Sequence, residues 1–309
     1  MDITVCICTH NRPHYLRDCL AGLRNQTFAA DRFDIVVVDS ASTGDVPVQV
    51  ARMVATIGNA RLLRLDQPGV SAARNAGAEA ARGEFVAYID DDAVPAPDWV
   101  ERIQAAIAGG DPPALIGGRI LPQWEAPLPP WWPARLRGLL SIIEYEGQGE
   151  YRSAALPPGL EPYGANMVVH APTILALGGF GHQIGRVGTA LQSDEDVELA
   201  WRLQAAGHSA RYDSRIVVRH QIQAARLTPR WLLSRLYWQG ASTVLTRRLL
   251  GEAGAVWCEL PRRLAVAALF APAGLVPPDS PRLLTWRWRL AYAAGFIRSA
   301  LGRPPGIRE

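Results

Sequence analysis

The amino-terminal third of the chain alternates short apolar runs with segments of helical periodicity. Each run is rich in β-branched and aromatic residues, which favours a strand. Helical patterns lie between them at residues 13–26 and 69–81. Apolar strands that alternate with helices predict an α/β fold, in which a mostly parallel central sheet has helices on both faces. The runs are residues 3–9 (ITVCICT), 33–40 (FDIVVVDS), 60–65 (ARLLRL) and 84–92 (EFVAYIDDD).

The sequence changes character over residues 112–158. Prolines and tryptophans cluster there in LPQWEAPLPPWWPARL. Proline interrupts a helix and cannot donate a hydrogen bond to the ladder of a central strand. We therefore expect an irregular segment, which either borders the functional site or is a purely structural plug.

Regular structure is predicted again after this segment. EPYGANMVVHAPTILALGGF indicates a turn, a short strand and a helix that ends at Gly178 and Gly179. SDEDVELAWRLQAAG indicates an amphipathic helix with an acidic start and a stop at Gly207. RYDSRIVVRH then predicts a last strand that ends on His220.

Beyond about Arg226 the alternation stops, and three helical stretches interleave arginine and tryptophan with apolar residues. We therefore divide the chain into a sheet domain over residues 1–222 and a helical extension over 223–309. The stretches are TPRWLLSRLYWQGASTVLTRRLL, LPRRLAVAALFAPAGLV and SPRLLTWRWRLAYAAGFIRSALGR.

The extension is not expected to span a membrane. Its longest apolar run, residues 264–276, contains Pro272 and Gly274 and is shorter than the roughly 20 residues that a span needs. An amphipathic surface rich in arginine and tryptophan suits peripheral contact with membrane headgroups. Docking onto the sheet domain and contact with an acceptor or a second copy of the chain are the alternatives.

Charge and composition exclude several classes of protein. The net charge is only +3 over 309 residues and no basic block occurs, so we expect no nucleic-acid binding. All 32 basic residues are arginine, which excludes a Schiff-base lysine and the P-loop lysine. The four cysteines have no CxxC spacing, which argues against zinc or redox chemistry. The chain starts directly in a strand pattern without a visible leader, so we expect a cytoplasmic protein, peripheral at the inner face of the membrane if the extension contacts lipid.

The acidic triplet Asp90, Asp91 and Asp92 follows directly on a buried strand pattern. Two carboxylates about 5 Å apart repel by roughly 3 kcal/mol at an effective dielectric constant of about 20. One aspartate could cap the helix that starts near Pro97, but this explanation does not account for three. A divalent cation would offset the repulsion.

Other polar residues also follow the predicted strands. Parallel sheets bind ligands beyond the carboxyl ends of their strands, so side chains at these ends should share one edge. They are Thr9 and Asn11 after the first strand, Asp39 and Ser42 after the second, and the triplet after the fourth.

Five ordered blocks resemble the family 2 glycosyltransferases, which have the GT-A fold. The resemblance runs from residue 3 to about 220, roughly seven-tenths of the chain, and does not cover the helical extension. It implies a DxD-type enzyme that uses Mn²⁺ or Mg²⁺ and transfers a sugar, with inversion, from a nucleotide-diphosphate donor to an acceptor hydroxyl. The blocks are VCICTHNRPHYLRDCLAGLRNQT, IVVVDSAS, GVSAARNAGAEAARGEFVAYIDDDAVPAPDWVE, GANMVVHAPTILALGGF and DEDVELAWRLQAAG…RIVVRH.

The resemblance also implies a metal site. Asp92 would be the direct ligand, with Asp90 and Asp91 holding ribose or water around the cation, and Asp90 is included in the predicted ligand set. His220 would be a further ligand, and imidazole favours Mn²⁺ over Mg²⁺. The simpler interpretation of His220 is a solvated or capping residue at a strand end.

For the displacement, the resemblance implies Asp196 as the general base and Glu195 as the residue that orients the acceptor. Acidic residues also favour helix starts for structural reasons, and Asp194 could simply cap the helix.

For the nucleotide, the resemblance implies binding through Asp90 and Asp91 and through residues at the first two strand ends and the third helix. The family usually has DDGS or DNGS after the second strand, whereas this chain has Asp39-Ser40-Ala41-Ser42, which keeps the first aspartate and alters the second polar position. Arg74 could also be a structural arginine. The remaining residues of this set are Thr9, Asn11, Arg12, Asp39 and Arg74.

Three rival interpretations are considered. A nucleotidyltransferase would need a glycine-rich loop with a lysine near the start of the chain, and a dehydrogenase would need GxGxxG after the first strand. Neither motif is there. A catalytically inactive sugar-nucleotide-binding module of a membrane-associated assembly would be expected to lose the aspartates or the base, which this chain keeps. The donor (a UDP-, GDP- or dTDP-sugar) and the acceptor (a glycan, glycolipid or glycosylated metabolite) are left open.

Overall fold

The computed structural model describes residues 2–109, 112–186 and 191–302. The chain forms two compact units. The first contains Met1–Gln123, Ser141–Phe180 and Leu199–Ile222, and the second contains Trp124–Leu140, Gly181–Glu198 and Gln223–Glu309.

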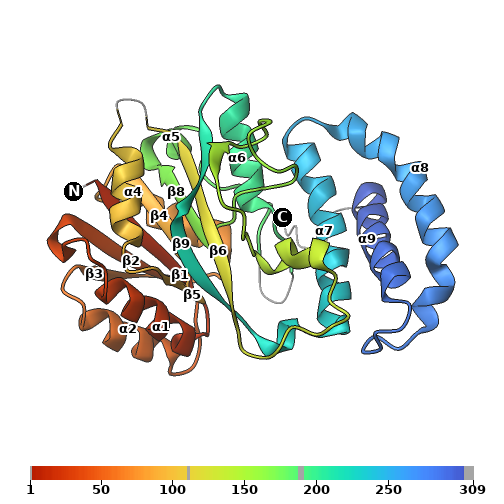
Figure 1. Ribbon diagram of the computed structural model, residues 1–309, viewed down its shortest axis with the longest axis horizontal. Coiled ribbons are helices and arrows are strands. Elements are labelled where there is room, and N and C mark those ends of the chain that lie inside the picture. Colours follow the sequence, from red (N-terminus) through yellow and green to blue (C-terminus); the bar gives the residue numbers. More distant parts are fainter. Residues whose placement is uncertain (1, 110–111, 187–190, 303–309) are drawn as a thin grey trace. The chain divides into compact units, whose positions relative to one another are not determined.

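A mixed sheet forms the centre of the first unit (Figure 1). The described strands lie in the order β3-β2-β1-β4-β8-β6-β9-β5, and β7 pairs with β9. The four strands β3, β2, β1 and β4 are parallel, as the apolar runs predict. Their bounds are β1 (Ile3–Thr9), β2 (Phe33–Ser40), β3 (Ala60–Leu65) and β4 (Phe85–Asp90).

The remaining strands join the parallel half through antiparallel pairs. β8 lies beside β4, and β9 carries both β5 and β7. The α/β fold class is therefore confirmed, with an antiparallel part added to the parallel sheet. The bounds are β5 (Ala93–Pro95), β6 (Leu115–Trp124), β7 (Gln148–Glu150), β8 (Asn166–His170) and β9 (Ala210–Ile222).

Helices pack against this sheet, and small residues allow the closest approach. A Cβ atom on Gly77 of α3 would lie 2.2 Å from Cys6 Sγ of β1, so the helix can rest on the strand only because that position is glycine. Cys6 is a buried core residue. The helices are α1 (Pro13–Arg24), α2 (Val46–Ala55), α3 (Val70–Glu79), α4 (Trp99–Ile107), α5 (Ala171–Ala176) and α6 (Glu195–Ala205).

The expectation of an irregular segment from residue 112 is wrong for its first part. β6 is an ordered strand that pairs with β8 inside the sheet. Leu115, Ile116 and Ile120 are buried, and glycine at 118 leaves room for the side chain of Asn166, which a Cβ atom would approach to 2.1 Å. The chain becomes irregular only beyond Trp124 and then forms the short 3₁₀ helix η2 (Ala134–Leu140).

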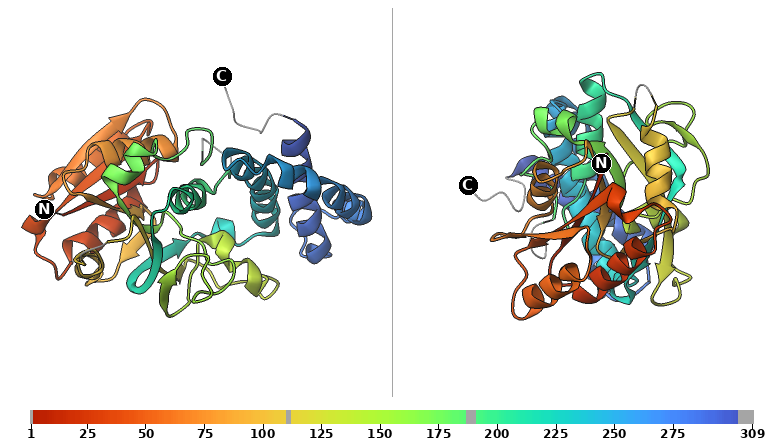
Figure 2. Two further views of the ribbon diagram at one scale, coloured as in Figure 1. Left: turned by 90° about the horizontal axis from the view of Figure 1, so that it is seen from above. Right: turned by 90° about the vertical axis from the view of Figure 1, so that its left-hand side faces the viewer.

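The second unit contains three long helices, α7 (Pro229–Leu249), α8 (Ala253–Phe270) and α9 (Leu284–Leu301), with the 3₁₀ turn η4 (Ala271–Leu275) after α8. α9 packs against both α7 and α8 (Figures 1 and 2). Glycines permit the closest contact, because a Cβ atom on Gly295 would lie 1.8 Å from the carbonyl oxygen of Tyr237. In the described part of the chain, no helix is both long and apolar enough to cross a membrane.

Helix α8 begins seven residues before the predicted start at residue 260 and contains Pro261 in its interior. Val256 and Leu260 pack with Val244 and Phe296 in a small hydrophobic core. Tertiary burial therefore holds the first turns helical despite the interior proline, which removes a backbone hydrogen bond.

Candidate functional site

The predicted binding residues at the ends of β1, β2 and β4 meet at one edge of the sheet. Strand register places Thr9 beside Asp39 and Cys8 beside Asp90, so β1, β2 and β4 end at the same level. This edge is the position at which open α/β sheets bind ligands.

The chain turns sharply after β4, and the turn brings His220 to the aspartates. Asp91 and Asp92 form the turn, and Ala93 of β5 then pairs with His220 of β9. The Gln221 N–H donates to the Asp92 carbonyl oxygen at 2.7 Å. As a result His220 Nε2 lies 3.2 Å from Asp92 Oδ1, and both side chains are only 2 % exposed.

Arg12 supplies the positive charge that the aspartates need. Its Nη2 lies 2.5 Å from Asp91 Oδ1, and its Nη1 lies 2.8 Å from Asp92 Oδ2. The Thr9 hydroxyl donates to Asp91 Oδ2 at 2.7 Å. Sequence analysis assigned Arg12 to the nucleotide. In the structure, its guanidinium bridges two acids and offsets their repulsion. Its contact with the nucleotide stays a prediction.

Burial dominates the electrostatics of this cluster. It raises the pKa of Asp91 to about 7, while the Arg12 guanidinium and the Thr9 hydroxyl lower that pKa. Burial lowers the pKa of Arg12, but the charges of Asp91, Asp92 and Asp90 outweigh it, so the pKa of Arg12 stays above its ordinary value. The guanidinium is therefore a permanent countercharge.

Asp90 faces a different arginine. Arg74 Nη2 lies 3.4 Å from Asp90 Oδ1, and the Asp90 side chain is 35 % exposed. Arg74 is itself buried and stacks over the Phe180 ring at 5.4 Å. The Tyr88 hydroxyl donates to the Arg74 carbonyl at 2.8 Å. Packing thus fixes Arg74 beside the first aspartate. Its contact with the nucleotide stays a prediction.

The residues present fit part of a cation site. Among the described residues, no three His, Cys, Asp or Glu side chains form a metal-binding cluster. Of the predicted ligands, Asp92 and His220 lie together, whereas Asp90 pairs with Arg74. The 3.2 Å between the Asp92 and His220 donor atoms is close to the about 3 Å that separates adjacent ligands of a small divalent cation. Such cations are commonly bound by one or two protein groups, with substrate phosphates and water completing the set.

Both carboxylate oxygens of Asp39 have partners within the protein. Its Oδ2 lies 2.9 Å from Arg64 Nη1, and its Oδ1 accepts a hydrogen bond from Ser42 N–H at 3.0 Å. The Asn11 side chain accepts from Thr43 N–H at 2.9 Å, so the loop after β2 is tied to the end of β1. Sequence analysis missed Arg64, although the register of β3 places it directly beside Asp39.

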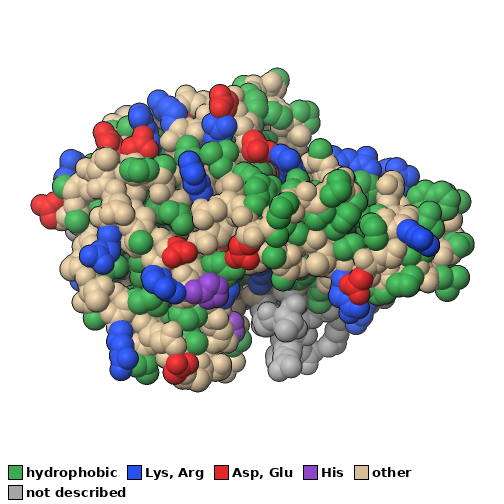
Figure 3. Space-filling view, turned by 60° about the horizontal axis from the view of Figure 1, so that its bottom comes forward, with side chains coloured by type: hydrophobic (Ala, Val, Ile, Leu, Met, Phe, Trp, Pro, Cys, Tyr) green, Lys and Arg blue, Asp and Glu red, His purple; other side chains and the backbone are tan. Residues whose placement is uncertain are grey.

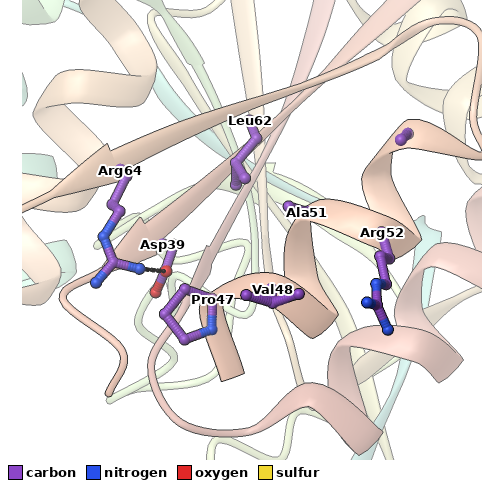
Figure 4. A pocket seen from close by; sticks show the side chains of 8 residues that line it. Asp39, Pro47, Val48, Ala51, Arg52, Leu62 and Arg64 are labelled. Carbon is purple, nitrogen blue, oxygen red and sulfur yellow. Dashed lines mark hydrogen bonds and ion pairs between the residues drawn. The ribbon is translucent and has the colours of Figure 1, made fainter. Parts of the chain in front are cut away.

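A surface pocket of about 510 Å³ lies next to Asp39 (Figure 4). Arg64 borders it, and the rest of its wall comes from α2 and from Leu62. Its size is within the range of small-ligand pockets. It is lined by Asp39, Pro47, Val48, Ala51, Arg52, Ala55, Leu62 and Arg64.

The predicted base belongs to the second unit. Asp196 and Glu195 are buried at the start of α6, and Asp196 Oδ1 accepts from Val197 N–H at 2.9 Å. Asp194 does not cap α6 through its side chain. Its carboxylate accepts hydrogen bonds from the Gln239 amide and the Ser193 hydroxyl, and burial raises its pKa. The catalytic roles of Glu195 and Asp196 stay predictions.

Comparison with known proteins gives consistent results. Residues 4–152 match the family model of Glycosyl transferase family 2. The chain is 27 % identical, over 246 residues, to a glucosyl-dolichyl phosphate glucuronosyltransferase of Haloferax volcanii, an alignment that covers 78 % of this chain and 76 % of the relative. It is 29 % identical, over 251 residues, to a pre-mycofactocin glycosyltransferase of Mycobacterium tuberculosis, covering 80 % of this chain but only 48 % of that relative. The chain thus spans about half the length of the mycobacterial protein.

Two solved structures have a similar fold. One is the mannosyltransferase PcManGT of Pyrobaculum calidifontis in complex with GDP-Man and Mn²⁺, with a TM-score of 0.61 and 19 % identity over 96 % of this chain and 86 % of that one. The other is the S. aureus TarS fragment in complex with UDP-GlcNAc, with a TM-score of 0.56 and 15 % identity over 97 % and 91 %.

Proposed function

Because this chain is a glycosyltransferase of family 2 with a GT-A fold, we propose that it transfers a sugar from a nucleotide-diphosphate donor to an acceptor hydroxyl, with inversion and with the help of a divalent cation. One observation supports this most strongly. The cluster of Asp91, Asp92, Arg12 and His220 lies at the carboxyl ends of β1 and β4, beside the Asp90–Arg74 pair. Buried side chains of opposite charge, held in fixed positions, can stabilise the charge on a diphosphate leaving group.

The donor would lie along this edge of the sheet. PcManGT was solved with GDP-Man and TarS with UDP-GlcNAc, which supports a nucleotide sugar as the ligand of this chain. We assign the base or ribose to the pocket beside Asp39, where Arg64 and the side chains of α2 form the wall. UDP-, GDP- and dTDP-sugars are all candidates.

Asp92 and His220 would hold the cation, with Mn²⁺ favoured by the imidazole ligand. When bound, a divalent cation neutralises negative charge on the diphosphate leaving group. Arg12 keeps Asp91 and Asp92 compensated in the absence of ligand. Arg74, fixed by Tyr88 and Phe180, offers a second guanidinium to the phosphates.

Inversion requires one base that accepts the proton of the acceptor hydroxyl. We assign this role to Asp196 and the orientation of the acceptor to Glu195. Both are buried carboxylates in the first turn of α6.

Turnover of candidate donors tests this proposal. Release of nucleoside diphosphate from UDP-, GDP- and dTDP-sugars should require Mn²⁺ or Mg²⁺ and should stop with a chelator. Asp196→Asn should retain donor binding in a thermal-shift assay, in which a ligand at a hundred times its dissociation constant adds about 2.7 kcal/mol of stability. The same variant should lose transfer.

The matched control is Asp98→Asn, which removes the charge of an exposed aspartate whose partner is Arg102. It should behave as the unmodified protein. Normal turnover by Asp196→Asn would reject the base assignment, and turnover that does not respond to the chelator would reject the role of the cation.

A further inference from the structure

Exposed large apolar side chains concentrate in the carboxyl-terminal helices. Among the described residues, only Val48 and Leu175 belong to this class outside the last three helices and their connections. Folded proteins rarely leave a large continuous apolar surface in water unless it binds something. The others are Leu249, Trp257, Leu264, Leu269, Leu275, Leu283, Trp286 and Leu301.

Helix α8 has two distinct faces. Val256, Leu260 and Phe270 are buried within the unit. Of the exposed positions of α8, all of which the structure describes, Arg262 is the one that carries a charge. We call Trp257, Leu264, Leu269 and Leu275 the outer face, since they are 55, 47, 69 and 88 % exposed along α8 and η4. Figure 3 shows hydrophobic side chains gathered over this part of the molecule.

The start of α9 carries a further exposed tryptophan beside the end of α8. The Trp286 ring lies 5.6 Å from the ring of Phe270, the last residue of α8, and Trp286 is 49 % exposed. Arg289 lies over the same phenylalanine ring at 5.6 Å. The apolar surface therefore includes two exposed tryptophans and reaches an exposed arginine at its end.

Two exposed arginines, Arg262 and Arg289, lie near the outer face, and one exposed carboxylate, Glu252, lies at the start of α8. Glu259 is paired with Arg247 and Arg263, and Asp279 with Arg230. No ion pair joins Arg262 or Arg289 to a carboxylate in the ranges that the structure describes, although both are exposed. The surface thus combines apolar side chains with arginines whose charge is not compensated by a neighbouring acid.

We propose that the outer face of α8 binds the surface of an anionic membrane. A helix with an apolar face and flanking basic residues lies in the headgroup region, where tryptophan and leucine enter the acyl boundary and arginine meets lipid phosphate. A second copy of the chain fits less well, because it would bring further uncompensated arginines to the contact, whereas an anionic lipid brings the opposite charge. The described helices are too polar or too short to span the bilayer, so the contact is peripheral.

Co-sedimentation of the full chain with lipid vesicles tests the proposal, and it is measured without donor, so that its outcome is independent of the transfer reaction. The chain should bind vesicles that contain phosphatidylglycerol, and binding should weaken on pure phosphatidylcholine and at high salt. Arg262→Gln and Arg289→Gln should each weaken binding about fivefold. Trp257→Glu combined with Leu269→Glu should weaken it by about tenfold or more.

The control is Leu175→Glu, which alters an exposed apolar residue (37 %) on α5. It should leave vesicle binding unchanged, and all variants should keep the unfolding temperature because the altered side chains are exposed. Equal loss in Leu175→Glu and in the outer-face variant would overturn the proposal. So would a failure to bind anionic vesicles, or self-association that the outer-face variant abolishes without any vesicle binding.

Discussion

Arg12 makes contacts in the structure that the sequence did not predict. The aspartate triplet predicts that a positive charge lies nearby, and the structure contains one. The Arg12 guanidinium supplies it, through contacts of 2.5 Å to Asp91 and 2.8 Å to Asp92. A divalent cation and Arg12 would therefore compensate the same carboxylates.

Replacing Arg12 by glutamine should destabilise the metal-free protein by about 2 kcal/mol, because two buried carboxylates lose their partner. Added Mn²⁺ should restore more stability to this variant than it gives to the unmodified protein, since the cation replaces the lost charge. Urea unfolding with and without Mn²⁺ measures both effects. Arg102→Gln, at an exposed ion pair, is the control and should change stability by less than about 0.5 kcal/mol. An Arg12→Gln protein as stable as the control would contradict this account.

Asp91 should make stability depend on pH. Burial raises its pKa from 3.8 to about 7 in the folded chain. The folded state therefore binds more protons than the unfolded state between these values, and the free energy of unfolding should fall as pH rises through this window. Asp91→Asn should flatten the dependence, as measured by urea unfolding at several pH values in the presence of a chelator. Asp98→Asn should not flatten it, and identical slopes for both variants would exclude Asp91 as the source.

The individual strands and helices were predictable where their signals are local. β1, β2 and β3 have the predicted bounds because apolar β-forming residues run to the end of each strand. β6 was not predicted, because the prolines and tryptophans at its end and beyond it dominate the segment. Its place in the sheet depends on pairing with β8, about fifty residues later in the chain. Non-local pairing of this kind leaves no periodic signal in the strand itself.

The candidate site was also predictable only in part. The convergence of Thr9, Asp39 and Asp90 follows from the parallel order of the strands, and the sequence predicts it. The contacts of Arg12 with Asp91 and of Arg64 with Asp39 depend on side-chain reach and strand register, which the sequence alone does not define. The proximity of Asp92 and His220 was expected from the resemblance, and the pairing of β5 with β9 produces it.

The packing of α7 against α9 should depend on glycine. A Cβ atom on Gly295 would lie 1.8 Å from the Tyr237 carbonyl, so Gly295→Ala should force the helices apart and cost about 1–3 kcal/mol. Gly254→Ala in α8 is the matched control, because its Cβ atom would meet nothing within 4 Å. It should stabilise the chain by up to about 1 kcal/mol through helix propensity. Urea unfolding measures both, and a neutral Gly295→Ala would refute the close contact.

The whole chain combines a sugar-transfer unit with helices that carry most of its exposed apolar surface. The net charge of +3 is spread over 309 residues, yet uncompensated arginines border the outer face of α8. This arrangement suits an enzyme whose acceptor is presented at a lipid surface. Removing the outer face should therefore reduce vesicle binding without changing the affinity for the donor, because the donor site that we propose does not include these residues.

Calorimetric titration of sugar nucleotides tests the central claim most directly. With Mn²⁺ present, at least one of the UDP-, GDP- and dTDP-sugars should bind, and both a chelator and Asp92→Ala should weaken that binding by about tenfold or more. Asp98→Ala should bind as the unmodified protein does. If no donor binds in the presence of Mn²⁺, or if binding is the same after chelation and in Asp92→Ala, the acidic turn after β4 is not the site at which this protein holds a diphosphate.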